Sequence, residues 1–297
     1  MSTVEFRHIT ERWRQSAGAT LREFSRSRAG LFGAFVLMSF VLLALAAPLI
    51  SSSRDLNPAL INTPLNAPPS SHFILGTDPE GRSVAICLIW GARTSLLVGF
   101  ISAFLSMVLG TAVGLMAAHF RGLFSGLLMR LIDFFLVVPS LILAIVLASV
   151  IGRSLLTIII AIAVTSWAST ARVVRAQALS IEARPYVERS WVLGSTHRHV
   201  LIRQVLPGVM PIVLAATTLQ VGNAIITEST LAFLGVSDPS STSWGSMLQL
   251  ALGSGAASAG YWWFVLAPGI AIVLVVMAFT LVGRAFESVV NPSFREG

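Results

Sequence analysis

Length, composition and charge place this chain among polytopic membrane proteins. Its 297 residues are 55% hydrophobic and 11% charged, and the mean hydropathy is +0.82, whereas soluble domains carry about 25% charged residues. The net charge of +7 comes from arginine, since the sequence contains no lysine. These arginines lie between apolar segments, which argues against nucleic-acid binding. The single Cys87 excludes an internal disulfide and a cysteine-clustered metal site.

Residues 1–28 form an arginine-bearing leader. Its apolar residues recur at helical spacings, with arginines and glutamates on the other face; they are Phe6, Ile9, Trp13, Ala17, Leu21 and Phe24. This pattern predicts an amphipathic helix in the cytoplasmic membrane interface, and a disordered basic tail is the alternative. The apolar segment 29–50 is longer than the core of a cleaved signal peptide, so we interpret it as the first transmembrane helix.

Six apolar segments are long enough to cross a bilayer, which takes about 20 residues. They are 29–50, 95–118, 134–151, 154–171, 208–235 and 261–283. The sequence therefore predicts an all-α membrane protein with six transmembrane helices, a core at residues 91–290 and a short tail at 291–297. Gly110 and Gly114 form a G-x-x-x-G pattern in the second segment, which predicts close helix packing.

The arginine distribution predicts the orientation. With the N-terminus in the cytoplasm, sixteen arginines lie inside and only Arg54, Arg82, Arg93 and Arg153 lie outside. Positive residues concentrate on the cytoplasmic side, so both termini and the tail 291–297 are expected there. Residues 51–90 and 236–260 are then extracytoplasmic. Each is longer than a minimal connector, and each could contact an external partner, cap the bundle or be an ordinary loop.

A hydrophilic insert at residues 182–207 separates the fourth and fifth apolar segments. Pro185 suits the first turn of a helix, Gly194 permits a left-handed turn, and a second helical stretch is predicted to end before Pro207. Two short helices would be marginal alone in water. We therefore expect the insert to dock on a soluble partner, with binding supplied mainly by apolar side chains.

The insert resembles a motif in the membrane subunits of binding-protein-dependent ABC importers. That motif reads EAA, three residues, Gly, nine residues, Ile, one residue, Leu-Pro. Glu188, Gly194 and Leu206–Pro207 occupy the matching places. The departures are Arg189 and Ser190 in place of the two alanines and Gln204 in place of the isoleucine.

Further segments resemble the peptide/nickel permease group, and within it the C-type permease of oligopeptide and dipeptide importers. They are LGTDPEGRS (75–83), GARTSLLVG (91–99), RLIDFFLVVPSLILAI (130–145), SWASTARVVRAQALS (166–180), ESTLAFLGV (228–236), SWG (243–245) and PGIAI (268–272). The group usually has Asp where Ser83 stands, Arg where Cys87 stands and an acidic residue where Arg284 stands. These departures leave the substrate and the receptor contact open.

The resemblance implies an importer in the bacterial cytoplasmic membrane, with a second related permease, two cytoplasmic ATPases and an extracytoplasmic substrate-binding protein. ATP and magnesium are expected on the ATPases, and no cofactor is expected on this chain, which without lysine has no G-x-x-x-x-G-K-[ST] motif. The resemblance makes 182–207 the coupling segment. ATPase docking is expected at Tyr186, Glu188, Arg189, Trp191, Gly194, His197 and Arg198. Peptides are the favoured substrates, with nickel and glutathione-like compounds as alternatives.

Polar residues within the apolar segments indicate helix contacts or a transport pathway. In the fifth segment they are Gln220, Asn223, Thr227 and Glu228. The first three form a stripe at helical spacing, and all four are candidates for contact with the second permease or with substrate. Arg130 and Asp133 are one turn apart and are expected to form a structural ion pair. Pro207 is assigned a structural role.

The sequence predicts no catalytic residues in this chain. It contains no visible nucleophile–base arrangement and no paired carboxylates within the spans, which argues against a membrane-embedded enzyme. The five histidines are scattered, and His197 and His199 would point in different directions on a helix. An ATP-independent secondary transporter or channel remains the alternative, but such proteins favour inverted repeats, and no convincing internal repeat is visible.

Overall fold

The computed structural model describes residues 24–290, and the regular secondary structure in that range is entirely helical. Five helices are long and apolar enough to cross a membrane, or six if one bent pair counts as a single span. The long helices are α2 (Arg28–Ile50), α3 (Val84–His119), α6 (Leu155–Glu182), α9 (Leu206–Phe233) and α11 (Trp262–Val290); the bent pair is α4 (Leu123–Val137) and α5 (Ser140–Ile151). This agrees with the predicted all-α membrane fold. Residues 1–23 of the leader and the tail 291–297 lie outside the described range.

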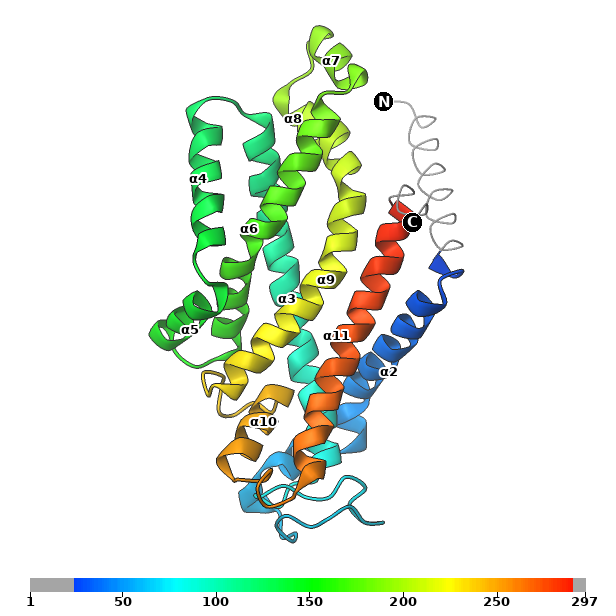
Figure 1. Cartoon of the computed structure of the whole chain (residues 1–297), viewed down its shortest axis with the longest axis vertical. Coiled ribbons are helices and arrows are strands. Elements are labelled where there is room, and N and C mark those ends of the chain that lie inside the picture. The colour runs from blue at the N-terminus through cyan, green and yellow to red at the C-terminus, as the bar shows by residue number, and fades with distance from the viewer. Residues whose placement is uncertain (1–23, 291–297) are drawn as a thin grey trace.

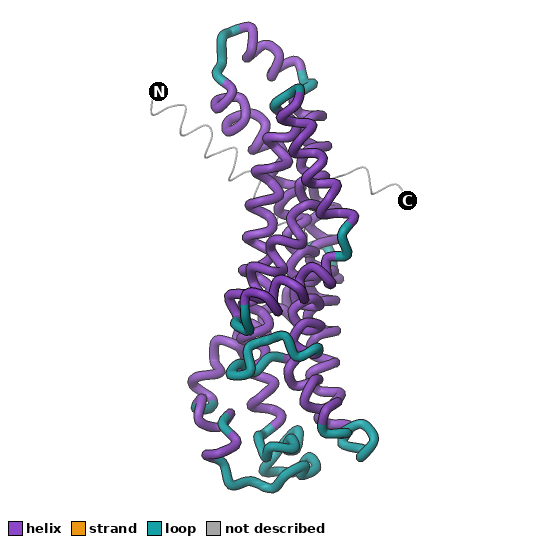
Figure 2. The backbone as a smooth tube through the Cα atoms, turned by 90° about the vertical axis from the view of Figure 1, so that its left-hand side faces the viewer, coloured by secondary structure: helices purple, strands orange, loops and turns teal. Residues whose placement is uncertain are grey.

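The helices form an elongated bundle with α3 at its centre (Figure 1). Helix α3 packs along α6, α9 and α2, and α11 packs against both α2 and α9. The 182–207 insert lies at one end, which we call the insert end, and most of the remaining loops gather at the opposite end (Figure 2). That opposite end carries η1 (Ser53–Leu56), η2 (Pro58–Leu60) and α10 (Trp244–Gly253).

The predicted close packing at Gly110 and Gly114 is confirmed. A Cβ atom on Gly110 would lie 2.6 Å from the carbonyl oxygen of Trp167, and one on Gly114 would lie 2.6 Å from that of Ala171. Real Cβ atoms do not approach backbone oxygen this closely. The two glycines therefore let α3 and α6 come into backbone contact along the centre of the bundle.

The third predicted span is wrong as a single helix. The chain bends by 91° between α4 and α5, because Val138 is extended (ψ 128°) ahead of Pro139. A residue before proline is disfavoured in the α conformation, and proline lacks the N–H that would continue the helix. The fourth apolar segment, 154–171, extends into its polar flank and forms part of the 28-residue α6.

The predicted helix end before Pro207 is wrong as well. Helix α8 (His197–Val200) continues through a π-helical turn, η3 (Leu201–Val205), into α9. Pro207 lies in the first turn of α9, where its missing N–H is tolerated. The insert is thus attached to α9 without an intervening loop, and residues 197–233 form one 37-residue helical unit.

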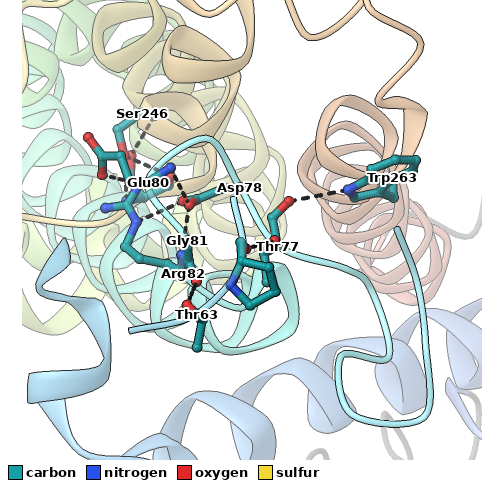
Figure 3. A network of polar contacts seen from close by, with 10 residues as sticks. Thr63, Thr77, Asp78, Glu80, Gly81, Arg82, Ser246 and Trp263 are labelled. Carbon is teal, nitrogen blue, oxygen red and sulfur yellow. Dashed lines mark hydrogen bonds and ion pairs between the residues drawn. The ribbon is translucent and has the colours of Figure 1, made fainter. Parts of the chain in front are cut away.

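Asp78 organises the chain at the opposite end (Figure 3). Its side chain is fully buried, and it accepts hydrogen bonds from the backbone N–H groups of Glu80 and Arg82 at 2.9 and 2.8 Å and from Arg82 Nε at 2.7 Å. The neighbouring carbonyl of Thr77 accepts a hydrogen bond from Trp263 Nε1 at 3.3 Å. This turn therefore fastens residues 63–83 to the start of α11.

Candidate functional site

Helix α7 (Pro185–Val192) presents an apolar surface at the insert end. Val187 is fully buried beneath it, whereas Tyr186, Val192 and Leu193 are 46%, 83% and 79% exposed. We call these three exposed residues the α7 face. Large apolar side chains gathered on an exposed element outside the bundle mark an interaction surface. The polar candidates Glu188, Arg189 and Arg198 are exposed around it.

A left-handed residue separates α7 from α8. Gly194 has φ +81°, and no heavy atom lies within 4 Å of the place where a Cβ would stand. Glycine is therefore needed for the backbone conformation and not for space. This agrees with the turn predicted at Gly194.

Two departures from the importer motif contact each other. Gln204 Nε2 donates a hydrogen bond to Ser190 Oγ at 2.6 Å, and Ser190 Oγ lies 2.7 Å from Ser195 Oγ. This chain of three side chains joins the end of α7 to the π-helical turn η3. The hydroxyl of Ser190 and the amide of Gln204, which stand where the motif has an alanine and the isoleucine, are thus hydrogen-bond partners of each other.

A second polar chain joins the insert to two long helices. His119, the last residue of α3, lies 2.7 Å from Glu182 Oε1 through Nδ1 and 2.8 Å from His197 Nδ1 through Nε2. Trp191 of α7 stacks on the His119 ring, with centroids 5.7 Å apart and planes at 25°. The Nδ1 atom of His197 is engaged by His119 inside the chain, while the residue stays exposed, and its expected contact with a partner stays a prediction.

The polar stripe of α9 lines a groove. Gln220, Asn223 and Thr227 share a cavity of about 450 Å³ with residues of the α4–α5 bend and of α6. The other lining residues are Phe135, Leu136, Val137, Val138, Pro139, Ser140, Thr165, Ser166, Ser169 and Ile226. We call this the polar groove. Its lining combines hydroxyl, amide and apolar groups and contains no ionisable side chain.

Glu228 does not line this groove. Its side chain is 3% exposed and accepts hydrogen bonds from Ser95 Oγ at 3.0 Å and from Ser229 Oγ at 3.3 Å. Ser95 Oγ also accepts a hydrogen bond from the N–H of Trp244, at 3.3 Å. Glu228 therefore links α9 to α3 and α10 within this chain, and its expected contact with the second permease or with substrate stays a prediction.

The expected Arg130–Asp133 ion pair is also wrong. Asp133 Oδ1 instead lies 2.6 Å from Arg172 of α6. Arg130 lies on the wall of a separate shallow cavity formed by the start of α4. The pair with Arg172 joins α4 to α6, a contact that the helical spacing within α4 could not reveal.

Residues 110–296 match the family described as the binding-protein-dependent transport system inner membrane component. The chain belongs to this family. Residues 16–69 of the permease match a second family, the N-terminal transmembrane domain of oligopeptide transport permease C.

Individual relatives cover nearly the whole permease. The dipeptide transport system permease protein DppC of Haemophilus influenzae is 32% identical over 92% of this chain and 93% of that protein. The oligopeptide transport system permease protein OppC of Bacillus subtilis is 31% identical over 92% of this chain and 88% of that protein. A solved structure of the MetNI methionine ABC transporter, in an inward-facing conformation, has a TM-score of 0.57 at 20% identity. It covers 68% of this chain and 96% of that chain, and this likeness supports the permease fold.

Sequence reasoning missed the partners that hold the insert in place. His119 was one of five scattered histidines, and Glu182 was only the first residue of the polar insert. Both stand at helix ends that are 63 residues apart in the chain. His119 follows directly on the apolar segment 95–118, whereas Glu182 lies eleven residues beyond the segment 154–171, and neither position identifies a partner.

Proposed function

We propose that this permease is a membrane-spanning subunit of an ATP-driven, binding-protein-dependent importer of dipeptides or oligopeptides. The family match supports the importer class, and the names of the curated relatives support peptides. The observation that carries the proposal is the insert with its exposed α7 face. A carrier that works without ATPases has no need for such a surface.

The proposed complex contains a second related permease, two ATP-binding subunits and an extracytoplasmic substrate-binding protein. The ATPases bind the α7 face, with Trp191, Gly194, His197 and the polar candidates around it shaping the contact. ATP and magnesium belong to those subunits, and this chain takes no catalytic part. The complex lies in the bacterial cytoplasmic membrane, with both termini in the cytoplasm. The binding protein docks at the opposite end, where a cavity of about 780 Å³ opens between η1, α3 and α10.

The polar groove is proposed as this subunit's side of the translocation path. Asn223 and Gln220 offer amide groups, and the surrounding serines and threonines offer hydroxyls. Such groups donate and accept hydrogen bonds with backbone amides of any peptide. Because no lining residue is charged, the groove would favour no side-chain charge, and selection among peptides would rest with the binding protein.

The movement of the ATPases would reach the groove through the helices that join it to the insert. Helix α6 ends at Glu182, next to the insert, and carries Ser166 and Ser169 of the groove. The unit 197–233 carries both the end of the insert and the stripe Gln220–Thr227. A displacement of α7 by closing ATPases would therefore be passed along rigid helices to both walls of the groove.

Reconstitution of the complex in proteoliposomes tests this function. Uptake of a labelled dipeptide should require ATP and the binding protein, and it should persist when ionophores collapse ion gradients. Leu193→Arg should abolish ATPase co-purification, because it places a charge in the α7 face. Leu60→Arg, on an apolar residue 64% exposed at the opposite end, should retain the ATPases. Uptake that follows an ion gradient without ATP would establish the secondary transporter instead.

A further inference from the structure

The His119 cluster joins three segments that are far apart in the sequence. His119 ends α3, Glu182 ends α6, and His197 begins α8. The side chain of His119 is 1% exposed and that of Glu182 is 21% exposed, so the contact between them lies largely outside water. Trp191 adds a ring contact from α7, with its centroid 4.9 Å from that of His197. The cluster therefore connects both helices of the insert to the core helices.

The hydrogen-bond chemistry requires imidazole at position 119. A carboxylate only accepts hydrogen bonds, so Nδ1 of His119 donates its proton to Glu182. Nε2 of His119 and Nδ1 of His197 then share one proton between them at 2.8 Å. A phenyl ring would fill the same space and stack on Trp191, but it would make neither bond. Packing and hydrogen bonding can therefore be separated by substitution.

The insert is joined to the bundle in three ways. It is covalently continuous with α6 through residues 183–184 and with α9 through η3, and both of these helices line the polar groove. The buried side chains of Val187 and Val200 belong to one apolar cluster with Leu115 of α3. The His119 cluster adds the polar contacts that tie the ends of α3 and α6 to α7 and α8. Without these contacts, a push on α7 would still reach α6 and α9, while α3, which packs along both, would keep only apolar contacts with the insert.

We propose that His119 is a positioning residue that couples movement of the insert to α3 and α6 during the transport cycle. The proposal rests on the proposed function, since it concerns how ATPase movement reaches the membrane helices. His119 contacts no substrate in this scheme and acts through Glu182, His197 and Trp191. Its loss should separate ATP hydrolysis from uptake without detaching the ATPases.

The test measures dipeptides taken up per ATP hydrolysed, using the complete importer in proteoliposomes. His119→Phe should lower this ratio at least fivefold while the ATPases still co-purify in wild-type amounts. Glu182→Leu should do the same, because it removes the acceptor for Nδ1. Glu182→Gln should stay within twofold of wild type, because its amide oxygen still accepts that hydrogen bond. His72→Phe, at an exposed histidine near the opposite end, is the matched control.

The outcomes separate this inference from the proposed function. Wild-type ratios in both His119→Phe and Glu182→Leu, with assembly intact, would overturn the role of His119 alone. Loss of the ATPases in both variants would also overturn it, because the cluster would then only shape the docking surface. A wild-type complex that shows no ATP-dependent uptake would overturn the proposed function, and the role of His119 in coupling with it.

Discussion

Gly194 holds the turn between α7 and α8 in a conformation that other residues adopt only with strain. Its φ of +81° lies in the left-handed region, where an L-residue loses roughly 1–2 kcal/mol. Gly194→Ala should therefore raise the fraction of open insert roughly fivefold to thirtyfold. Limited trypsin digestion of the purified permease at the arginines of the insert measures this opening. Unchanged cleavage would show that the turn relaxes without strain.

Gly126 of α4 provides the control for Gly194. It also has open space around a hypothetical Cβ, but it lies inside a helix and has no positive φ. Gly126→Ala should leave cleavage of the insert unchanged. Alanine is favoured over glycine in a helix interior by about 0.5–1 kcal/mol, so the variant should be as stable as the parent or slightly more so.

The Ser190–Gln204 pair can be tested by a double-mutant cycle. Ser190→Ala deprives the Gln204 amide of its acceptor, and an unsatisfied buried polar group costs about 1–3 kcal/mol. Gln204→Ile alone leaves Ser190 its contact with Ser195, so this variant should lose less stability than Ser190→Ala. The double variant restores an alanine and the isoleucine of the motif, and its stability should be close to that of the parent protein. Thermal unfolding in detergent measures each, and additive losses would contradict the pairing.

The roles of single residues were predicted well where they depend on local backbone conformation, and poorly where they depend on a partner distant in the sequence. The turn at Gly194 was predicted because a glycine within a hydrophilic helical segment commonly marks a left-handed turn. Ser190 and Gln204 were read only as departures from a motif, since their contact depends on the π-helical turn between them. Asp133 was given the wrong partner because its partner lies on another helix. Arg130 is near in sequence, but Arg172 is near in space.

At the scale of elements, the α3–α6 contact limits what can stand at Gly110. A Cβ there would meet the Trp167 carbonyl at 2.6 Å and Thr170 at 2.7 Å, so the helices must separate. Overpacking of this kind costs about 1–3 kcal/mol. Gly110→Ala should lower the unfolding temperature in detergent. Gly269→Ala, in α11 with no heavy atom within 4 Å of the Cβ position, should not.

The turn around Asp78 should be fragile to loss of its carboxylate. Asp78→Ala leaves Arg82, only 14% exposed, without its buried partner and two backbone N–H groups without an acceptor. Breaking a buried ion pair in this way costs about 3–5 kcal/mol. Glu80→Ala removes a half-exposed contact to the same arginine and should cost under about 1 kcal/mol. Protease cleavage within residues 51–83 should rise only in Asp78→Ala.

The length of the apolar segments predicted where the helices lie, but it did not predict where the helices end or bend. Segments 95–118 and 154–171 became parts of α3 and α6, which extend well beyond the apolar runs, since α3 begins at Val84 and α6 ends at Glu182. The end of α6 is held by the contact of Glu182 with His119, which hydropathy does not reveal. The bend at Val138–Pro139 lies in a continuous apolar stretch, so hydropathy alone could not mark it, although proline offered a signal.

On the scale of the whole molecule, the uncharged lining of the polar groove makes a prediction about transport. Asn223→Asp would add a negative charge, which repels a substrate carboxylate about 8 Å away by about 2 kcal/mol at an effective dielectric constant of 20. Uptake of acidic dipeptides should fall at least tenfold relative to neutral ones. Asn223→Ser, which stays neutral, should keep the ratio. Equal losses for both peptide classes would place the path elsewhere.

The π-helical turn η3 has a consequence for how the insert is aimed. A π turn holds one residue more than the α turn that would replace it, and each residue of an α-helix turns the chain by about 100°. The extra residue therefore sets the rotation of the insert about the helix axis relative to α9. Deleting one residue within 201–205 would keep α9 in the bilayer and rotate α8 by about 100° about the α9 axis, which would change how the insert presents the α7 face that we propose binds the ATPases.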